Sequence, residues 1–194
     1  LIKNKNFINS LVENVSNILN LVSKRKFNSI ILNYDKNSCD LFYWYQQLVA
    51  ESLGKKNKGI LPVISNMPKD NHSLMQLYLD GTKKNFFTFF FVNDEFSKKI
   101  NNNNLFRSHY YLKDKKLHDI KYSQYMATKR VFKKKDIPFR SFEIKKRNEE
   151  TLGELFTFFI LETILMSRAI NINPFNQPAV ELIKKETKRI LISS

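Results

Sequence analysis

A glutamate near the end of an expected helix is the first side chain whose position could support chemistry. Residues 38–54, SCDLFYWYQQLVAESLG, have the apolar spacing of a helix that Gly54 ends. Gln47 and Glu51 are four residues apart, so they share one side of this helix, beside Trp44. The negative end of the helix dipole and partial burial both disfavour an ionised carboxylate there. Glu51 is thus a candidate general base near neutral pH, and an ordinary surface glutamate is the alternative.

The stretch NPFNQPAVELIKK, residues 173–185, ends in two lysines that are not equivalent on the helix expected over 178–191. Pro178 suits the first helical position, where its missing N–H costs nothing. At about 100° per residue, Lys184 borders the apolar face and Lys185 lies nearly opposite it. That face consists of Val180, Ile183, Thr187, Ile190 and Leu191. We expect the side chain of Lys184 to be half-buried. The alternative is a surface lysine whose aliphatic part only lies along the edge of the apolar face, because it would have the same spacing.

The three histidines offer one further candidate. His72 lies at the start of a helix expected over 71–81, with Asn71 as its N-cap, where the positive end of the helix dipole keeps an imidazole neutral. His109 and His118 have no partner pattern. No spacing of His, Cys, Asp or Glu resembles a zinc or iron site, and neither a phosphate-binding glycine loop nor a nucleophile elbow is present. The residues by themselves therefore indicate no metal site and no phosphate-binding loop.

Strands and helices alternate along the chain, which predicts an α/β fold with a mainly parallel sheet flanked by helices. The strand expected over 85–93 is apolar on both faces, as in a sheet covered on both sides, and the one over 139–146 alternates like an edge strand. Ligands of such sheets bind beyond the carboxyl ends of the strands, so the loops after Asn66, Val92 and Ile170 are the places to search. The other expected strands cover 27–34 and 59–67, and the other expected helices cover 7–23, 116–135 and 149–170.

Length and composition limit the classes of function. A chain of 194 residues is the size of one domain, and its net charge of +15 raises the possibility of nucleic-acid binding. The lysines are scattered, however, and the cluster 133–135 has no regular aromatic interleaving, so a solvated basic surface is the simpler interpretation. No apolar run is long enough for a membrane span and no signal peptide is visible. The single cysteine, Cys39, cannot form an internal disulfide, and we expect a cytoplasmic protein.

Three separated motifs together resemble one enzyme family. WYQQLVAESLGK, DNHSLMQLYLDG and GELFTFFILETILMSRAINI followed by NPFNQPAVELIKK occur in the order found in the C-terminal part of glucose-6-phosphate isomerases. The last stretch resembles the family signature NPFDQPGVE, which a lysine soon follows. Two positions depart from it, because Asn176 replaces an Asp and Ala179 replaces a Gly. The resemblance extends from about residue 30 to the end and is weakest over 94–140.

The resemblance implies roles for five residues. Glu51 corresponds to the base that moves a proton between sugar carbons 1 and 2 through an enediol, without a metal or organic cofactor. His72 corresponds to the histidine that assists ring opening and comes from the neighbouring subunit of a homodimer. Lys184 corresponds to the lysine that contacts the region of the ring oxygen. Gln47 and Gln177 correspond to polar residues that hold the sugar phosphate.

The resemblance also implies that the chain is incomplete. The family binds the substrate phosphate with a Ser/Thr-rich loop and has an arginine in a Gly-Gly-Arg motif, and neither feature occurs here. Residues 1–194 would be the C-terminal sugar-isomerase-type domain of a longer enzyme of glycolysis and gluconeogenesis whose N-terminal half is missing. Alone, the chain should be inactive. A sugar-phosphate-binding module without catalysis and a nucleic-acid-binding protein are the alternatives.

Overall fold

The computed structural model describes residues 4–93, 97–100 and 105–193, and its centre is a four-stranded parallel sheet. The strands are β1 (Asn28–Asn33), β2 (Leu61–Asn66), β3 (Asn85–Val92) and β4 (Phe139–Ile144), in the order β2-β1-β3-β4. All three pairings are parallel, for example Ile31 beside Ile64 and Thr88. The α/β fold class and the four expected strands are therefore confirmed, including β4 at an edge.

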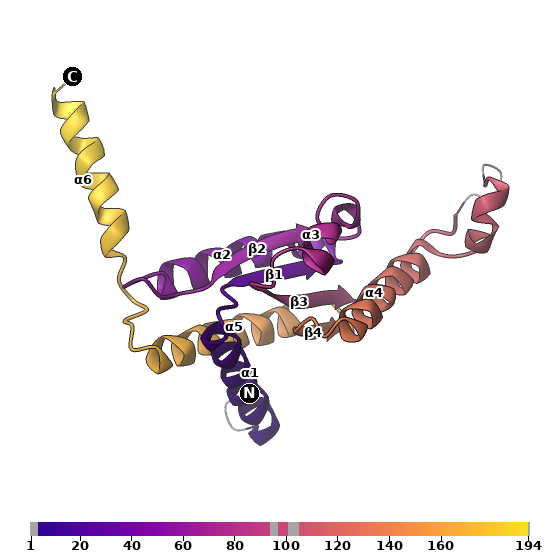
Figure 1. Cartoon of the computed structure of the whole chain (residues 1–194), viewed down its shortest axis with the longest axis horizontal. Coiled ribbons are helices and arrows are strands. Elements are labelled where there is room, and N and C mark those ends of the chain that lie inside the picture. The colour runs from indigo at the N-terminus through magenta and orange to yellow at the C-terminus, as the bar shows by residue number, and fades with distance from the viewer. Residues whose placement is uncertain (1–3, 94–96, 101–104, 194) are drawn as a thin grey trace.

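Both faces of the sheet are covered, because β3 is apolar on both faces and all eight of its residues are buried. Helices α1 (Lys5–Ser23), α2 (Cys39–Leu53) and α5 (Glu149–Ala169) cover one face, where Phe42 and Phe159 pack with Phe90. Helices α3 (Met75–Asp80) and α4 (Leu117–Lys134) cover the other face, where Tyr125 packs against Phe89. The molecule thus has three layers (Figure 1).

A buried polar network joins five elements on the face covered by α2. Arg140 of β4 donates to Glu162 of α5 over 2.7 Å, to Tyr45 of α2 over 3.2 Å and to Thr88 of β3 over 2.9 Å. Asn14 of α1 donates to the same carboxylate over 3.0 Å. Burial of Tyr45, reinforced by the Glu162 carboxylate, raises the pKa of its phenol. Glu162 is only 1% exposed, so these donors replace the hydrogen bonds that water would otherwise give its carboxylate.

The direction of the strands decides which loops can meet. A helix that follows a parallel strand starts at the carboxyl edge of the sheet and returns to the amino edge. The ends of α2 and α5 therefore lie at the amino edge, together with the start of α6 (Pro178–Ser193), whereas the loop after β2 lies at the carboxyl edge (Figure 1). The expectation that the loop after Ile170 lies at the carboxyl edge is wrong, because this loop follows a helix.

Two details of the helices differ from the sequence-based expectations. Asn71 does not cap α3, because residues Lys69–Asn71 form a separate 3-10 turn and α3 begins at Met75; Gly81 does end the helix. Every residue of α6 is exposed, since the helix projects away from the sheet instead of laying its apolar face on it (Figure 1).

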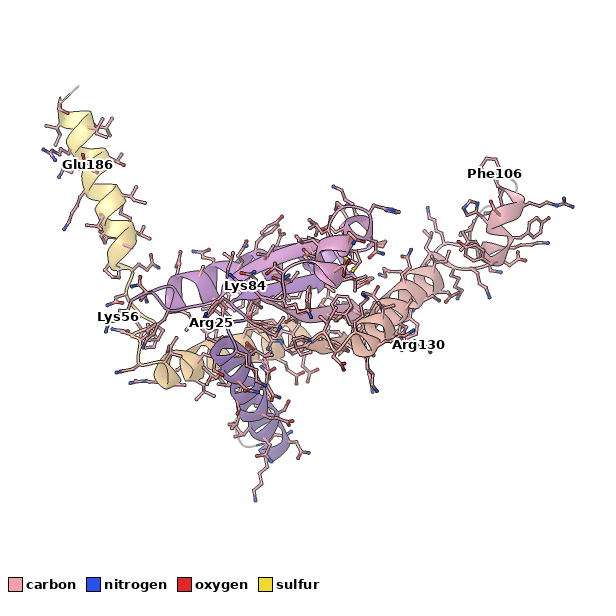
Figure 2. The ribbon with its side chains drawn as sticks, viewed as in Figure 1. Arg25, Lys56, Lys84, Phe106, Arg130 and Glu186 are labelled. Carbon is pink, nitrogen blue, oxygen red and sulfur yellow. The ribbon has the colours of Figure 1, made fainter. Side chains whose placement is uncertain are left out.

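Another 3-10 segment, Arg107–Leu112, projects beyond the start of α4, with Phe106 at its tip (Figure 2). Within the described residues, no helix is long and apolar enough for a membrane span.

Candidate active site at the amino edge of the sheet

Three of the five predicted site residues form one hydrogen-bonded cluster. Gln47 and Glu51 lie one turn apart on α2, and Gln47 Nε2 donates to Glu51 Oε1 over 3.0 Å. Gln177, which is 126 residues further along the chain, donates from its Nε2 to Glu51 Oε2. Each oxygen of the half-buried carboxylate therefore accepts one amide proton. The cluster lies where α2 ends and the connector to α6 passes, at the amino edge of the sheet.

The end of α2 is set by the loop that returns the chain to β2. Gly54 caps the helix with its N–H on the carbonyl of Ala50, at 3.0 Å. Gly59 then adopts φ 122°, a conformation that side chains with a Cβ rarely adopt, and a Cβ there would lie 2.9 Å from the carbonyl oxygen of Leu53. Glu51 therefore lies in the last turn of α2, three residues before this return begins at Gly54.

Two lysines of this loop contact the connector between α5 and α6, residues 170–177. Lys55 Nζ donates to the carbonyl of Asn173 over 2.7 Å, and Lys58 Nζ donates to that of Ile170 over 2.9 Å. Desolvation lowers the pKa of the Lys55 ammonium, and the nearby Glu51 carboxylate opposes that shift. Sequence reasoning missed both lysines. The signal available was their place in the run KKNK, directly after the helix that carries Glu51.

An apolar cavity of about 530 Å³ lies beside this loop, between the ends of α1, α2 and α5. Its walls are mainly aliphatic, for example Leu19, Leu53 and Met166, and neither Glu51 nor Gln177 lines it. The polar cluster is therefore on an open surface next to the cavity. Among the described residues, no group of three His, Cys, Asp or Glu side chains could hold a metal ion.

His72 is not part of the cluster. It is exposed and ends the 3-10 turn Lys69–Asn71 at the carboxyl edge of the sheet. Asp70 holds this loop, since its Oδ2 accepts from the N–H of Asn66 at 2.7 Å and from Ser65 Oγ at 2.9 Å. Helix α2 runs from the carboxyl edge to the amino edge and is about 22 Å long at 1.5 Å per residue. Within one chain, His72 and Glu51 therefore lie at opposite edges of the sheet.

Lys184 is also outside the cluster, and the expectation that it is half-drawn into the protein is wrong. Its side chain is 65% exposed and its Nζ donates to Glu181 on the same helix over 2.7 Å. This contact raises the pKa of the Lys184 ammonium. The helix phase was correct, because α6 starts at Pro178 as expected, but no described part of the chain covers its apolar face. Figure 2 shows Lys56 near the base of α6 and Glu186 well out along it.

Comparison with known proteins finds glucose-6-phosphate isomerases among the sequence relatives of this chain. No protein-family model matches the chain. The glucose-6-phosphate isomerase of Mycoplasmopsis pulmonis (strain UAB CTIP) is 34% identical over 177 residues, which is 88% of this chain and 41% of that protein. The glucose-6-phosphate isomerase of Methanocaldococcus jannaschii is 33% identical over 168 residues, 84% of this chain and 40% of that protein. The chain spans about two fifths of the length of these relatives.

Solved structures support the fold. A hypothetical protein from Thermus thermophilus aligns with a TM-score of 0.81 over 89% of this chain and 43% of its own, at 23% identity. A glucose-6-phosphate isomerase from Chlamydia trachomatis aligns with a TM-score of 0.65 over 85% and 34%, at 16% identity. The arrangement of strands and helices is therefore shared with proteins more than twice as long. Over most of its length the chain is therefore similar to a part of glucose-6-phosphate isomerases, which confirms the resemblance seen in the sequence.

Proposed function

We propose that residues 1–194 are the C-terminal domain of a longer cytoplasmic enzyme that interconverts glucose 6-phosphate and fructose 6-phosphate. The observation that carries the proposal is the hydrogen bonding of Glu51. Its two carboxylate oxygens accept from Gln47 and Gln177, two residues that the resemblance assigns to the same site from distant parts of the sequence. The relatives named above support the reaction class.

In the proposed mechanism Glu51 is the general base. After ring opening, it takes the proton from carbon 2 of the sugar and returns it to carbon 1 through an enediol intermediate. A carboxylate has about four lone-pair positions, and the two amides use one on each oxygen. The remaining positions can accept the proton, while the amides hold the carboxylate in one orientation, as proton transfer requires. The step needs neither a metal nor an organic cofactor.

We propose that His72 assists ring opening from a second copy of the protein. His72 and Glu51 lie at opposite edges of one sheet, so a site that uses both on one small sugar must combine two chains. A two-fold dimer would form two such sites.

A subunit-mixing experiment tests this arrangement. The experiment uses subunits of a full-length enzyme that contains this chain, one carrying Glu51→Gln and the other His72→Ala, each inactive alone. Random mixing makes half of the dimers heterodimers, and each heterodimer has one intact site out of two. The mixture should therefore regain about a quarter of the wild-type activity. An inactive mixture that contains heterodimers would contradict the shared site.

The test of Glu51 uses a completed enzyme, made by joining this chain behind the amino-terminal portion of the Mycoplasmopsis pulmonis relative. Glu51→Gln keeps the shape of the side chain but cannot accept the proton. It should lower kcat by about 10²- to 10⁴-fold and leave sugar-phosphate binding nearly unchanged. The matched control is Glu154→Gln, the same change at an exposed position of α5. If Glu51→Gln keeps more than about a tenth of the rate, Glu51 is not the base.

Lys184 is proposed to reach the region of the ring oxygen once α6 packs against the rest of a longer protein. Its present exposure means that this role rests on the resemblance and on the apolar stripe that Lys184 borders. In the completed enzyme, Lys184→Ala should reduce kcat/KM more than Lys185→Ala. Equal effects would remove Lys184 from the site.

The alternative is a sugar-phosphate-binding module without catalysis. It predicts that the completed enzyme binds fructose 6-phosphate but does not isomerise it. The 194 residues alone should show no isomerase activity under the main proposal, because binding energy from the phosphate contributes to positioning the reacting sugar. Measurable turnover by this chain alone would contradict the proposed need for the rest of the enzyme.

A further inference from the structure

The connector between α5 and α6 has few anchors to the rest of the chain. Ile172 is buried, with 5% of its surface exposed, whereas residues 173 and 175–177 are exposed. Beyond Ile172, the hydrogen bonds to other described parts of the chain are the one from Lys55 to the Asn173 carbonyl and the one from Gln177 to Glu51. The hydrogen bonding of this part of the connector therefore depends on two side chains, Lys55 and Gln177.

The same short segment brings Gln177 to the proposed base. Gln177 lies four residues after Asn173. The N–H of Phe175 donates to Asn173 Oδ1 over 2.9 Å, and this hydrogen bond stabilises a turn between the two residues. An ammonium donating to a carbonyl is a charge-assisted hydrogen bond and is stronger than one between neutral groups. Lys55 thus fixes the point from which Gln177 reaches Glu51.

Lys58 supports the beginning of the connector in the same way, through the carbonyl of Ile170 at 2.9 Å. Both lysines belong to the loop that follows Glu51. The proposed base and the two lysines that hold the connector therefore come from one stretch of sequence, residues 51–58. Lys55 also interacts electrostatically with the Glu51 carboxylate.

We propose that Lys55, assisted by Lys58, is a positioning residue that clamps the α5–α6 connector so that Gln177 meets Glu51. The catalytic consequence of the clamp rests on the proposed isomerase function. The clamp itself does not rest on that function, because it consists of the hydrogen bonds from Lys55 and Lys58 to the carbonyls of Asn173 and Ile170. The two parts can therefore be tested separately.

The first test measures hydrogen exchange of the amides in residues 170–177, by mass spectrometry on the completed enzyme. Lys55→Met removes the donor and should increase the exchange rate of this segment. Lys56→Met is the matched control, because Lys56 is an exposed lysine of the same loop and its loss changes the net charge equally. Lys55→Arg keeps a charged donor and should restore protection. Lys58→Met should speed exchange near residue 170 and provides a second reading if Lys55→Met folds poorly.

The second test measures kinetics in the same proteins. Lys55→Met should lower kcat/KM by roughly 10- to 100-fold, the effect expected when a reacting group is displaced by about 1 Å. Lys56→Met should have the wild-type value, and Lys55→Arg should recover most of the loss. A role that is only structural would lower the amount of folded protein without this rescue by charge.

The outcomes separate the two proposals. Equal exchange in Lys55→Met and Lys56→Met would overturn the clamp. Faster exchange in Lys55→Met with unchanged kcat/KM would overturn its catalytic consequence. A completed enzyme that has no isomerase activity, but in which exchange depends on Lys55, would refute the proposed function and leave the clamp supported.

Discussion

Replacing Arg140 should destabilise the domain severely, because its removal leaves a carboxylate buried without its cation. Glu162 is 1% exposed and its closest charged partner is the Arg140 guanidinium at 2.7 Å. In Arg140→Met, the donors to Glu162 that remain among the described residues are Asn14 and Tyr45. Breaking a buried ion pair on one side costs about 3–5 kcal/mol, which is a large part of a typical unfolding free energy of roughly 5–15 kcal/mol. The melting temperature should fall by about 6–20 °C.

A double-mutant cycle on the 194-residue chain, followed by urea denaturation, measures the coupling. Glu162→Met should cost a similar amount, since it leaves the Arg140 guanidinium buried. Replacing both residues by Met removes both charges, and the remaining cost of about 1–3 kcal/mol comes from polar neighbours such as Thr88 that lose a partner. The double variant should therefore be far more stable than the sum of the single variants predicts. Arg130→Met, on an exposed part of α4, is the control and should change stability by less than about 0.5 kcal/mol.

Additivity of the two single effects would refute the reasoning, because it would mean that the charges do not interact or are reached by water. The network also joins α2 to the sheet through Tyr45, and α2 carries Glu51. Loss of the pair should for this reason also affect the candidate site.

Two glycine variants and one lysine variant test other features of the fold. Gly153→Ala should stabilise the chain by about 0.4–1 kcal/mol, because a Cβ there meets no atom within 4 Å on helix α5. Gly59→Ala should destabilise it by about 1–2 kcal/mol, because φ is 122°. Urea denaturation measures both variants, and a destabilising Gly153→Ala or a stabilising Gly59→Ala would contradict the local geometry. The hydrogen bond from Lys129 lowers the pKa of the Glu143 carboxyl below its ordinary value of 4.5. The stability that this hydrogen bond contributes is therefore present above pH 4.5 and is lost as the pH falls through the lowered pKa. The difference in urea midpoint between wild type and Lys129→Met should therefore shrink below about pH 4.5, and Lys133→Met should show no such change.

Much of the fold could be predicted because local patterns determine it. The run NFFTFFFV predicts a strand that is buried on both faces, and such a strand needs helices on both sides of its sheet. Gly54 and Gly81 end their helices as expected, because a glycine after an apolar repeat interrupts it locally. Asn71 shows the limit of such reasoning. A residue of a type that caps helices can instead lie in a 3-10 turn, and the contacts of Asp70 favour that turn here.

The sequence by itself determined which side chains could do chemistry, through their types and their spacing on one helix. The pairing of Gln47 with Glu51 needs only the pitch of α2, and the structure contains it. The resemblance named Gln177 as well, but the contact between Gln177 and Glu51 depends on a connector that returns from α5 at the amino edge of the sheet.

Tertiary structure alone decided the positions of Lys184, His72 and Lys55. Lys184 has the helix phase that the sequence predicts, yet it is exposed because burial requires a second surface and not only an apolar face. His72 and Glu51 are separated because parallel strands send the ends of strands and the ends of helices to opposite edges of the sheet. Lys55 was missed because its partner is a backbone carbonyl 118 residues away. Contacts to the backbone leave no mark in the identity of the partner residue, so only the folded chain reveals them.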